Sequence, residues 1–272
     1  MSTQKVALVT GVSSGIGQSV ARTLAERGLK VFGTSRNPSD VETVPGVEVL
    51  PLDVRLDESV SACMDAVLKQ AGRLDILVNN AGYNLKGAIE ETSLEEAQAQ
   101  FETNFWGAVR MVRAALPVMR RQGSGQIINV SSVGGLMALP FGGFYCASKF
   151  ALEGYTEALR HEVMPFNVQV SLVEPGAINT HFVPNTQPAA NPIQDYAPWR
   201  ERVQAATTRV FEKASEPAVV AECVSRIVDD KTPKLRYHMG KSAGSLVLLR
   251  HFLPYSVFER MGRRRLGLDV KD

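Results

Sequence analysis

Cysteine, long apolar runs and net charge are all scarce in this sequence. It holds only three cysteines, Cys63, Cys146 and Cys223, and their spacing suggests no pairing. This argues against a disulfide framework or a metal site and indicates a reducing compartment, so we expect a cytoplasmic protein. The 30 lysines and arginines nearly balance 28 acidic residues, and the net charge of +2 gives no indication of a nucleic-acid partner.

Long apolar segments are also missing. No stretch approaches the roughly 18 uncharged apolar residues of a membrane-spanning helix. The amino-terminal stretch MSTQKVALVTG carries one lysine and an apolar run that is too short for a secretory signal. The most apolar late stretch, residues 244–258, is interrupted by Arg250, His251 and Pro254.

Short apolar runs alternate with amphipathic segments along the chain. The apolar runs predict strands at residues 5–10, 30–36, 47–54, 74–82, 125–132, 167–176 and 235–240. Helical periodicity predicts helices at 16–27, 59–71, from about 93 with Pro117 near the end, 145–164 and 216–230. This alternation predicts one α/β domain over residues 1–272, a doubly wound Rossmann fold with about seven parallel strands and helices on both faces.

Two segments depart from the alternation. Residues 177–200 are rich in proline and have little periodicity, so we expect either a disordered loop or a substrate lid, over about 177–215. The tail, about 241–272, mixes apolar and basic residues. We expect it to cover a substrate pocket or a subunit contact, with Arg263, Arg264 and Arg265 in solvent. Contact with an anionic membrane surface is the less favoured alternative.

The stretch TGVSSGIG, residues 10–17, joins the first expected strand to the first helix. Gly11 permits a tight turn, Gly15 lets the backbone approach a pyrophosphate, and Gly17 allows the helix to pack closely on the strand. The free N–H groups of the helix then face the phosphates. A glycine-rich turn without a ligand is the alternative at this point.

Three motifs in this order resemble the short-chain dehydrogenase/reductase family. They are TGxxxGIG from Thr10, NNAG at residues 79–82 and YxxxK at residues 145–149. The resemblance extends from about Lys5 to Thr180. The stretch SVGGLMALPFGGFYCASKFALEG, residues 132–154, is most similar to the 17β-hydroxysteroid dehydrogenase and retinol dehydrogenase-like branch.

The resemblance implies a nicotinamide cofactor, and the end of the second strand predicts which one. Family members that prefer NAD carry an acidic residue there, whereas this chain has GTSR, ending in Arg36. A guanidinium attracts a 2′-phosphate that a carboxylate would repel, so we expect NADP(H). Ser13 and Ser14 would assist in the glycine turn, and a merely solvated Arg36 is the alternative.

Other cofactor contacts are implied by the family motifs. Asp53 and Val54 would hold the adenine, although Asp53 could equally be a helix-capping or turn residue. The remaining positions are spread over the glycine turn, the NNAG motif, the catalytic pair and PGAINT at 175–180; they are Gly11, Gly15, Ile16, Gly17, Asn80, Ala81, Gly82, Tyr145, Lys149, Pro175, Gly176, Ile178 and Thr180. Asn79 is instead expected to tie neighbouring strands together.

Tyr145 and Lys149 lie one helical turn apart, which places their side chains about 6 Å from each other. A nearby ammonium favours the phenolate, so we expect a lowered pKa at Tyr145 and a role for it as acid and base. In the family the lysine also binds the nicotinamide ribose. Ser132 matches the serine that holds the substrate oxygen, with Ser131 as the alternative, and Asn104 matches the relay position.

The expected substrate wall is apolar. It comprises residues 134–144 and, from the lid, Phe182, Val183, Tyr196 and Trp199. Such a wall suits a steroid, retinoid or fatty carbonyl.

These features together predict an oxidoreductase that interconverts a hydrophobic secondary alcohol and its carbonyl. The alternatives are a reductase of acyl or quinone-like carbonyls and a non-catalytic NADP-binding regulator. Family resemblance further implies a homodimer or homotetramer. It could pair through the small residues of the 145–164 helix.

Overall fold

The computed structural model describes residues 4–180, 186–241 and 243–269. Its main sheet is parallel, with the strand order β3-β2-β1-β4-β6-β7-β9. The strands are β1 Val6–Thr10, β2 Lys30–Ser35, β3 Val47–Pro51, β4 Ile76–Asn79, β6 Gly125–Val130, β7 Val168–Pro175 and β9 Arg236–Met239. The order reverses between β1 and β4, which is where open parallel sheets bind ligands. The predicted doubly wound fold is confirmed.

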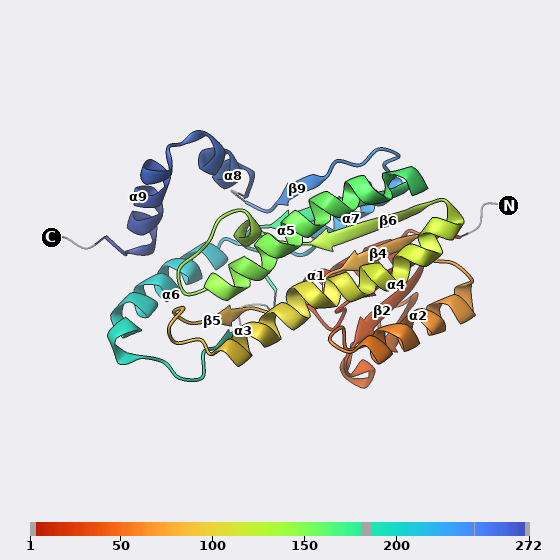
Figure 1. Ribbon diagram of the computed structural model, residues 1–272, viewed down its shortest axis with the longest axis horizontal. Coiled ribbons are helices and arrows are strands. Elements are labelled where there is room, and N and C mark those ends of the chain that lie inside the picture. The colour runs from red at the N-terminus through yellow and green to blue at the C-terminus, as the bar shows by residue number, and fades with distance from the viewer. Residues whose placement is uncertain (1–3, 181–185, 242, 270–272) are drawn as a thin grey trace.

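Helices cover both faces of this sheet (Figure 1). Helices α1 and α7 pack on one face, and α2, α4 and α5 pack on the other. Their bounds are α1 Gly15–Glu26, α2 Asp57–Ala71, α4 Gly107–Gln122, α5 Gly143–Val163 and α7 Ala218–Asp229. The strands are buried from both sides, as is expected when helices cross over between parallel strands.

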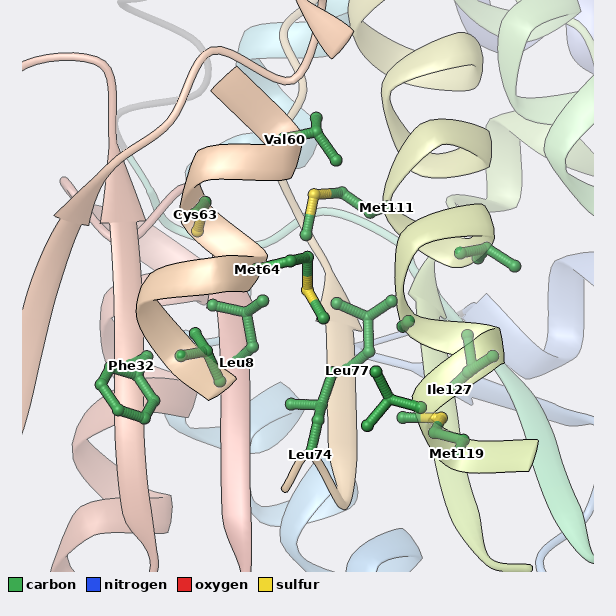
Figure 2. Close-up of a cluster of buried hydrophobic side chains, with 14 of the residues drawn as sticks. Leu8, Phe32, Val60, Cys63, Met64, Leu74, Leu77, Met111, Met119 and Ile127 are labelled. Atoms are coloured by element: carbon green, nitrogen blue, oxygen red, sulfur yellow. The ribbon is translucent and has the colours of Figure 1, made fainter. Parts of the chain in front are cut away.

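The larger core cluster lies between the sheet and helices α2 and α4. Figure 2 shows Met64 of α2 and Met111 of α4 pointing toward one another above Leu77 of β4. Met111 and Leu77 are fully buried. Unbranched methionine side chains fill irregular gaps between two helices that cross a twisted sheet.

Helix α4 differs from the sequence expectation in two ways. Pro117, expected near the end of the helix as a kink or a stop, does not stop it, and α4 continues to Gln122. Buried residues on both sides of the proline, such as Ala115 and Val118, keep the apolar face continuous, and this packing offsets the lost hydrogen bond. The expected single long helix is also divided, because α3 Leu94–Phe101 joins α4 through a π-helical turn, Glu102–Trp106.

The late segments contain more helix than expected. The expected lid region includes α6 Ala197–Phe211, and the tail forms α8 Ala243–Phe252 and α9 Tyr255–Leu266. Helix α8 lies next to β9, and α9 lies beside α6 (Figure 1). A short parallel pair joins β5 Leu85–Lys86 to β8 Gln187–Pro188. Within the described ranges, no helix has the length and apolar content needed to span a bilayer.

Candidate active site

The glycine turn after β1 has the backbone that only glycine adopts freely. Gly11 and Gly15 have φ of 74° and 62°, in the left-handed region. A Cβ on Gly17 would lie 2.1 Å from the Gly11 carbonyl oxygen, so the helix could not approach the strand with a larger residue. Ser13 is exposed, Ser14 is the N-cap of α1 and the half-buried Ile16 lies in its first turn, which carries no acidic residue. These residues fit a bound pyrophosphate.

The NNAG motif supports this turn. The Asn80 side-chain amide donates to the carbonyl oxygens of Thr10 and Gly11 at 2.9 and 3.0 Å. The N–H groups of Asn80 and Ala81 donate to the Thr10 hydroxyl. Asn79 donates to the Asn129 side chain of β6 at 2.9 Å, so its expected role in tying strands together is confirmed.

The segment after β7 lies against the glycine turn. A Cβ on Gly15 would be 3.1 Å from the Thr180 side chain, so the glycine turn and the PGAINT motif lie next to each other. Pro175 ends β7, and the Gly176 N–H donates to Met239 of β9. The bridge between Ile178 and Ser215 is formed by the N–H of Asn179 and the C=O of Ala177, which both bond to Ser215. The backbone N–H and C=O of Ile178 itself therefore point away from Ser215.

Arg36 is exposed directly after β2, and its positive charge helps to lower the pKa of Asp53. The main cause of that lowering is Arg55, whose guanidinium binds the Asp53 carboxylate at 2.6 Å. Arg55 was not among the predicted site residues, although its place two residues after Asp53 was a signal. Two guanidinium groups therefore lie near Asp53, while the Val54 side chain is buried against Gly107.

Asn104 is 2% exposed and lies in the π-helical turn between α3 and α4. Its side chain accepts from the Tyr83 N–H at 3.0 Å and donates to the Tyr83 carbonyl at 2.9 Å. It also donates to the Ser148 hydroxyl at 3.3 Å, and it lies beside Gly82. Because these bonds engage the side-chain amide, a proton relay at this position would use the backbone of Asn104. The π-helical turn is a further indication, since such turns often occur at functional sites.

The two serines after β6 have different surroundings. The Ser132 hydroxyl accepts from the Gly134 N–H at 3.0 Å and is hydrogen-bonded to the Tyr145 phenol. Ser131 is instead buried beside Glu153. The geometry therefore favours Ser132 over the alternative Ser131 as the serine next to Tyr145.

Tyr145 and Lys149 lie in the first half of α5. Burial raises the pKa of Tyr145 to about 12, and the hydrogen bond to Ser132 opposes this rise. Burial lowers the pKa of Lys149 to about 8, and its Nζ donates to the Val130 carbonyl at 2.9 Å. The lowering of the Tyr145 pKa expected from the Lys149 ammonium is wrong, because burial disfavours the phenolate more than the hydrogen bond to Ser132 favours it.

The segment expected to form a lid is anchored to the residues before α3. The buried Glu91 carboxylate forms an ion pair with Arg200 of α6 and accepts from the Ile193 N–H at 2.9 Å. Tyr196 packs edge-on against Phe141 of the expected substrate wall, with ring centroids 6.3 Å apart. Trp199 is half-buried and stacked on Arg202. Phe182 and Val183, which were also expected in this wall, lie outside the described residues.

The chain is similar to several known proteins over most of its length. The profile of the short chain dehydrogenase family matches residues 5–191. The 3-ketodihydrosphingosine reductase of Bacteroides thetaiotaomicron is 41% identical over 87% of this chain and 88% of its own length. Human 17-beta-hydroxysteroid dehydrogenase type 1 is 38% identical over 85% of this chain and 76% of its own. A short-chain dehydrogenase structure from Streptomyces avermitilis superposes with a TM-score of 0.81 and 34% identity, over 98% of this chain and 100% of that chain.

Similar structures hold either nicotinamide cofactor. A Thermococcus sibiricus alcohol dehydrogenase, complexed with 5-hydroxy-NADP, has a TM-score of 0.70 and 28% identity over 86% of this chain and 96% of its own. A Brucella melitensis 3-ketoacyl-(acyl-carrier-protein) reductase, complexed with NADH, has a TM-score of 0.73 and 26% identity over the same shares. The fold therefore accepts both cofactors, and the choice between them depends on local residues.

Proposed function

Because the chain belongs to the short-chain dehydrogenase family, we propose that it is an NADP(H)-dependent oxidoreductase that interconverts a hydrophobic secondary alcohol and its ketone. One observation carries this proposal. The hydroxyls of Ser132 and Tyr145 are hydrogen-bonded to each other, and the buried Lys149 follows one turn later. A carbonyl oxygen placed between two such hydroxyls would receive hydrogen bonds from both.

Each of these side chains has a separate task. Tyr145 is neutral near pH 7, because burial raises its pKa to about 12, and a neutral phenol is the form that donates a proton to the carbonyl oxygen. Ser132 holds that oxygen and stabilises the charge that develops on it. Lys149 supplies positive charge behind the phenol and binds the ribose. The bound nicotinamide would supply or accept the hydride.

The glycine turn and the residues beside it would hold the cofactor. Gly11, Gly15 and Gly17 allow the backbone to approach the pyrophosphate, and Thr180 lies against the same turn. The exposed Arg36, with Arg55 nearby, supports the choice of NADP(H), since both carry positive charge to the place where the 2′-phosphate is expected.

We further propose that residues 177–215 form a lid over an apolar substrate. The ion pair of Glu91 with Arg200 and the edge-on contact of Tyr196 with Phe141 support this proposal, because Phe141 belongs to the expected substrate wall. The relatives named for a sphingosine ketone and a steroid support a fatty or steroid carbonyl. A panel of such ketones, including 3-ketodihydrosphingosine, is the first screen for turnover with NADPH.

Tyr145→Phe tests the proposed acid. We expect turnover to fall by about 100- to 10,000-fold, because proton transfer by a positioned side chain contributes that much, while NADPH binding measured by fluorescence changes little. The matched control is Tyr155→Phe, which changes a half-buried tyrosine on the same helix that packs on Phe105. Unchanged turnover in the Tyr145 variant would remove the proposed acid, and NADPH binding without any wild-type turnover would favour the regulator.

Arg36→Asp tests the cofactor choice. We expect the ratio of kcat/KM for NADPH over NADH to fall by about 10- to 100-fold, the equivalent of losing a charged hydrogen bond. Arg22→Asp, at an exposed position on α1, makes the same change of charge and should leave the ratio unaltered. A ratio that responds equally to both substitutions would contradict a specific contact with the phosphate.

A further inference from the structure

A pair of buried carboxylates lies behind the candidate active site. Glu153 of α5 is 4% exposed, and Glu174 of β7 is fully buried. Arg236 of β9 forms ion pairs with both, and its distance to Glu174 is 2.6 Å. It also binds the half-exposed Glu157, one turn after Glu153, while His238 contacts Glu174.

This cluster holds more negative than positive charge away from water. Two carboxylates that share one guanidinium in a buried site cannot both ionise without cost, so one of them retains a proton to higher pH. Burial and the repulsion of Glu174 raise the pKa of Glu153 to about 7, although Ser131 and Arg236 act in the opposite direction. Burial and the charge of Arg236 lower the pKa of His238, so the histidine does not supply the missing positive charge.

The cluster is in contact with the residues of the site. Glu153 lies one helical turn after Lys149, on the same face of α5. A Cβ on Gly135 would be 2.9 Å from the Ser131 hydroxyl oxygen, 3.0 Å from the Glu153 Cγ and 3.1 Å from the Lys149 carbonyl oxygen. Glu153 therefore packs directly behind the strand end that carries Ser132 and behind the helix turn that carries Lys149.

Building on the proposed function, we propose that Glu153 is a positioning residue for Lys149, and that its carboxylate, held by Arg236, is the counter-charge that keeps the buried lysine protonated. The pKa of Lys149 is lowered to about 8 because burial disfavours the ammonium, and the charge of Glu153 opposes that lowering. The titratable and charged groups that face Glu153 are Lys149 on its own helix, Glu174 on β7, and Arg236 and His238 on β9. Arg236 opposes the rise in the pKa of Glu153, which at about 7 stays below that of Lys149, so the carboxylate is charged in the range where the lysine would otherwise lose its proton.

The direct test is the titration of Lys149 itself. The ¹³Cε resonance of Lys149, assigned by its loss in Lys149→Met, reports the pKa of this lysine without cofactor or substrate. In Glu153→Gln we expect that pKa to fall by about one unit or more, the effect of removing an opposite charge at close range. The alkaline limb of kcat/KM for carbonyl reduction should move down by the same amount. Glu153→Asp, which keeps the charge, should restore most of both values.

Glu157→Gln is the matched control, because it removes another carboxylate from the same arginine one turn farther from Lys149. It should leave the Lys149 titration unchanged. Should Glu153→Gln not fold, the wild-type ¹³Cε curve still decides, because the ionisation of Glu153 should produce a separate minor step near its own pKa of about 7. An unshifted Lys149 pKa in folded Glu153→Gln, or a wild-type curve with one step, would overturn the proposal. Failure of the proposed function would show separately, as absent turnover with an intact titration.

Discussion

Gly17→Ala is the substitution whose effect the structure defines most sharply. The added Cβ would lie 2.1 Å from the Gly11 carbonyl oxygen and 2.4 Å from the Asn80 amide nitrogen, so the turn and the helix must separate. The separation would disturb the two hydrogen bonds from Asn80 to Thr10 and Gly11. At about 1–3 kcal/mol for each partly buried bond, we expect a loss of about 3 kcal/mol in the free energy of unfolding.

A loss of that size corresponds to a fall of about 6–12 °C in Tm for a chain of this length. Differential scanning calorimetry measures this fall, and NADPH fluorescence titration should show binding weakened by more than about tenfold, because the phosphate-facing N–H groups are displaced. Gly262→Ala in α9 is the control, since its Cβ meets no atom within 4 Å. A Gly17→Ala protein with wild-type Tm and NADPH affinity would refute this account of the turn.

Two further substitutions test the core and the lid. Met111→Ala empties a fully buried position between α2 and α4 and should lower the free energy of unfolding by about 2–5 kcal/mol in a urea titration, whereas Met164→Ala, at an exposed position, should change it little. Arg200→Ala removes the partner of the buried Glu91 and should raise KM for the ketone more than it lowers kcat, whereas the exposed Arg209→Ala on the same helix should change neither. Equal effects within either pair would contradict the assigned contacts.

The alternation of short apolar runs with helical periodicity was sufficient to predict the sheet and its flanking helices, because each element must bury one face against the next. Pro117 was misjudged because local propensity favours a helix end at proline, whereas the packing of Ala115 and Val118 on the sheet carries α4 through it. The π-helical turn around Asn104 was not predicted, and the hydrogen bonds of the Asn104 side chain go to Tyr83, a residue distant in the sequence.

The site residues were predicted as positions, but their interactions were not. Sequence spacing placed Tyr145 and Lys149 on one helix face, yet it could not show that burial raises the pKa of the phenol. Likewise, Glu153, Glu174 and Arg236 come from three separate elements, and only the parallel register of β7 with β9 brings the last two together. Contacts of this kind follow from the tertiary arrangement and have no local signal.

Helices α8 and α9 lie after the last strand of the sheet and carry a single fully buried side chain between them, Ala243. That alanine lies 3.4 Å from the position a Cβ on Gly176 would occupy, so the start of α8 packs against the segment after β7, while α9 contacts α6. The outer helix α9 is therefore a suitable place to immobilise the protein on an electrode or to fuse a reporter. Because none of its side chains is buried, α9 should also tolerate substitutions that the buried strands of the sheet would not.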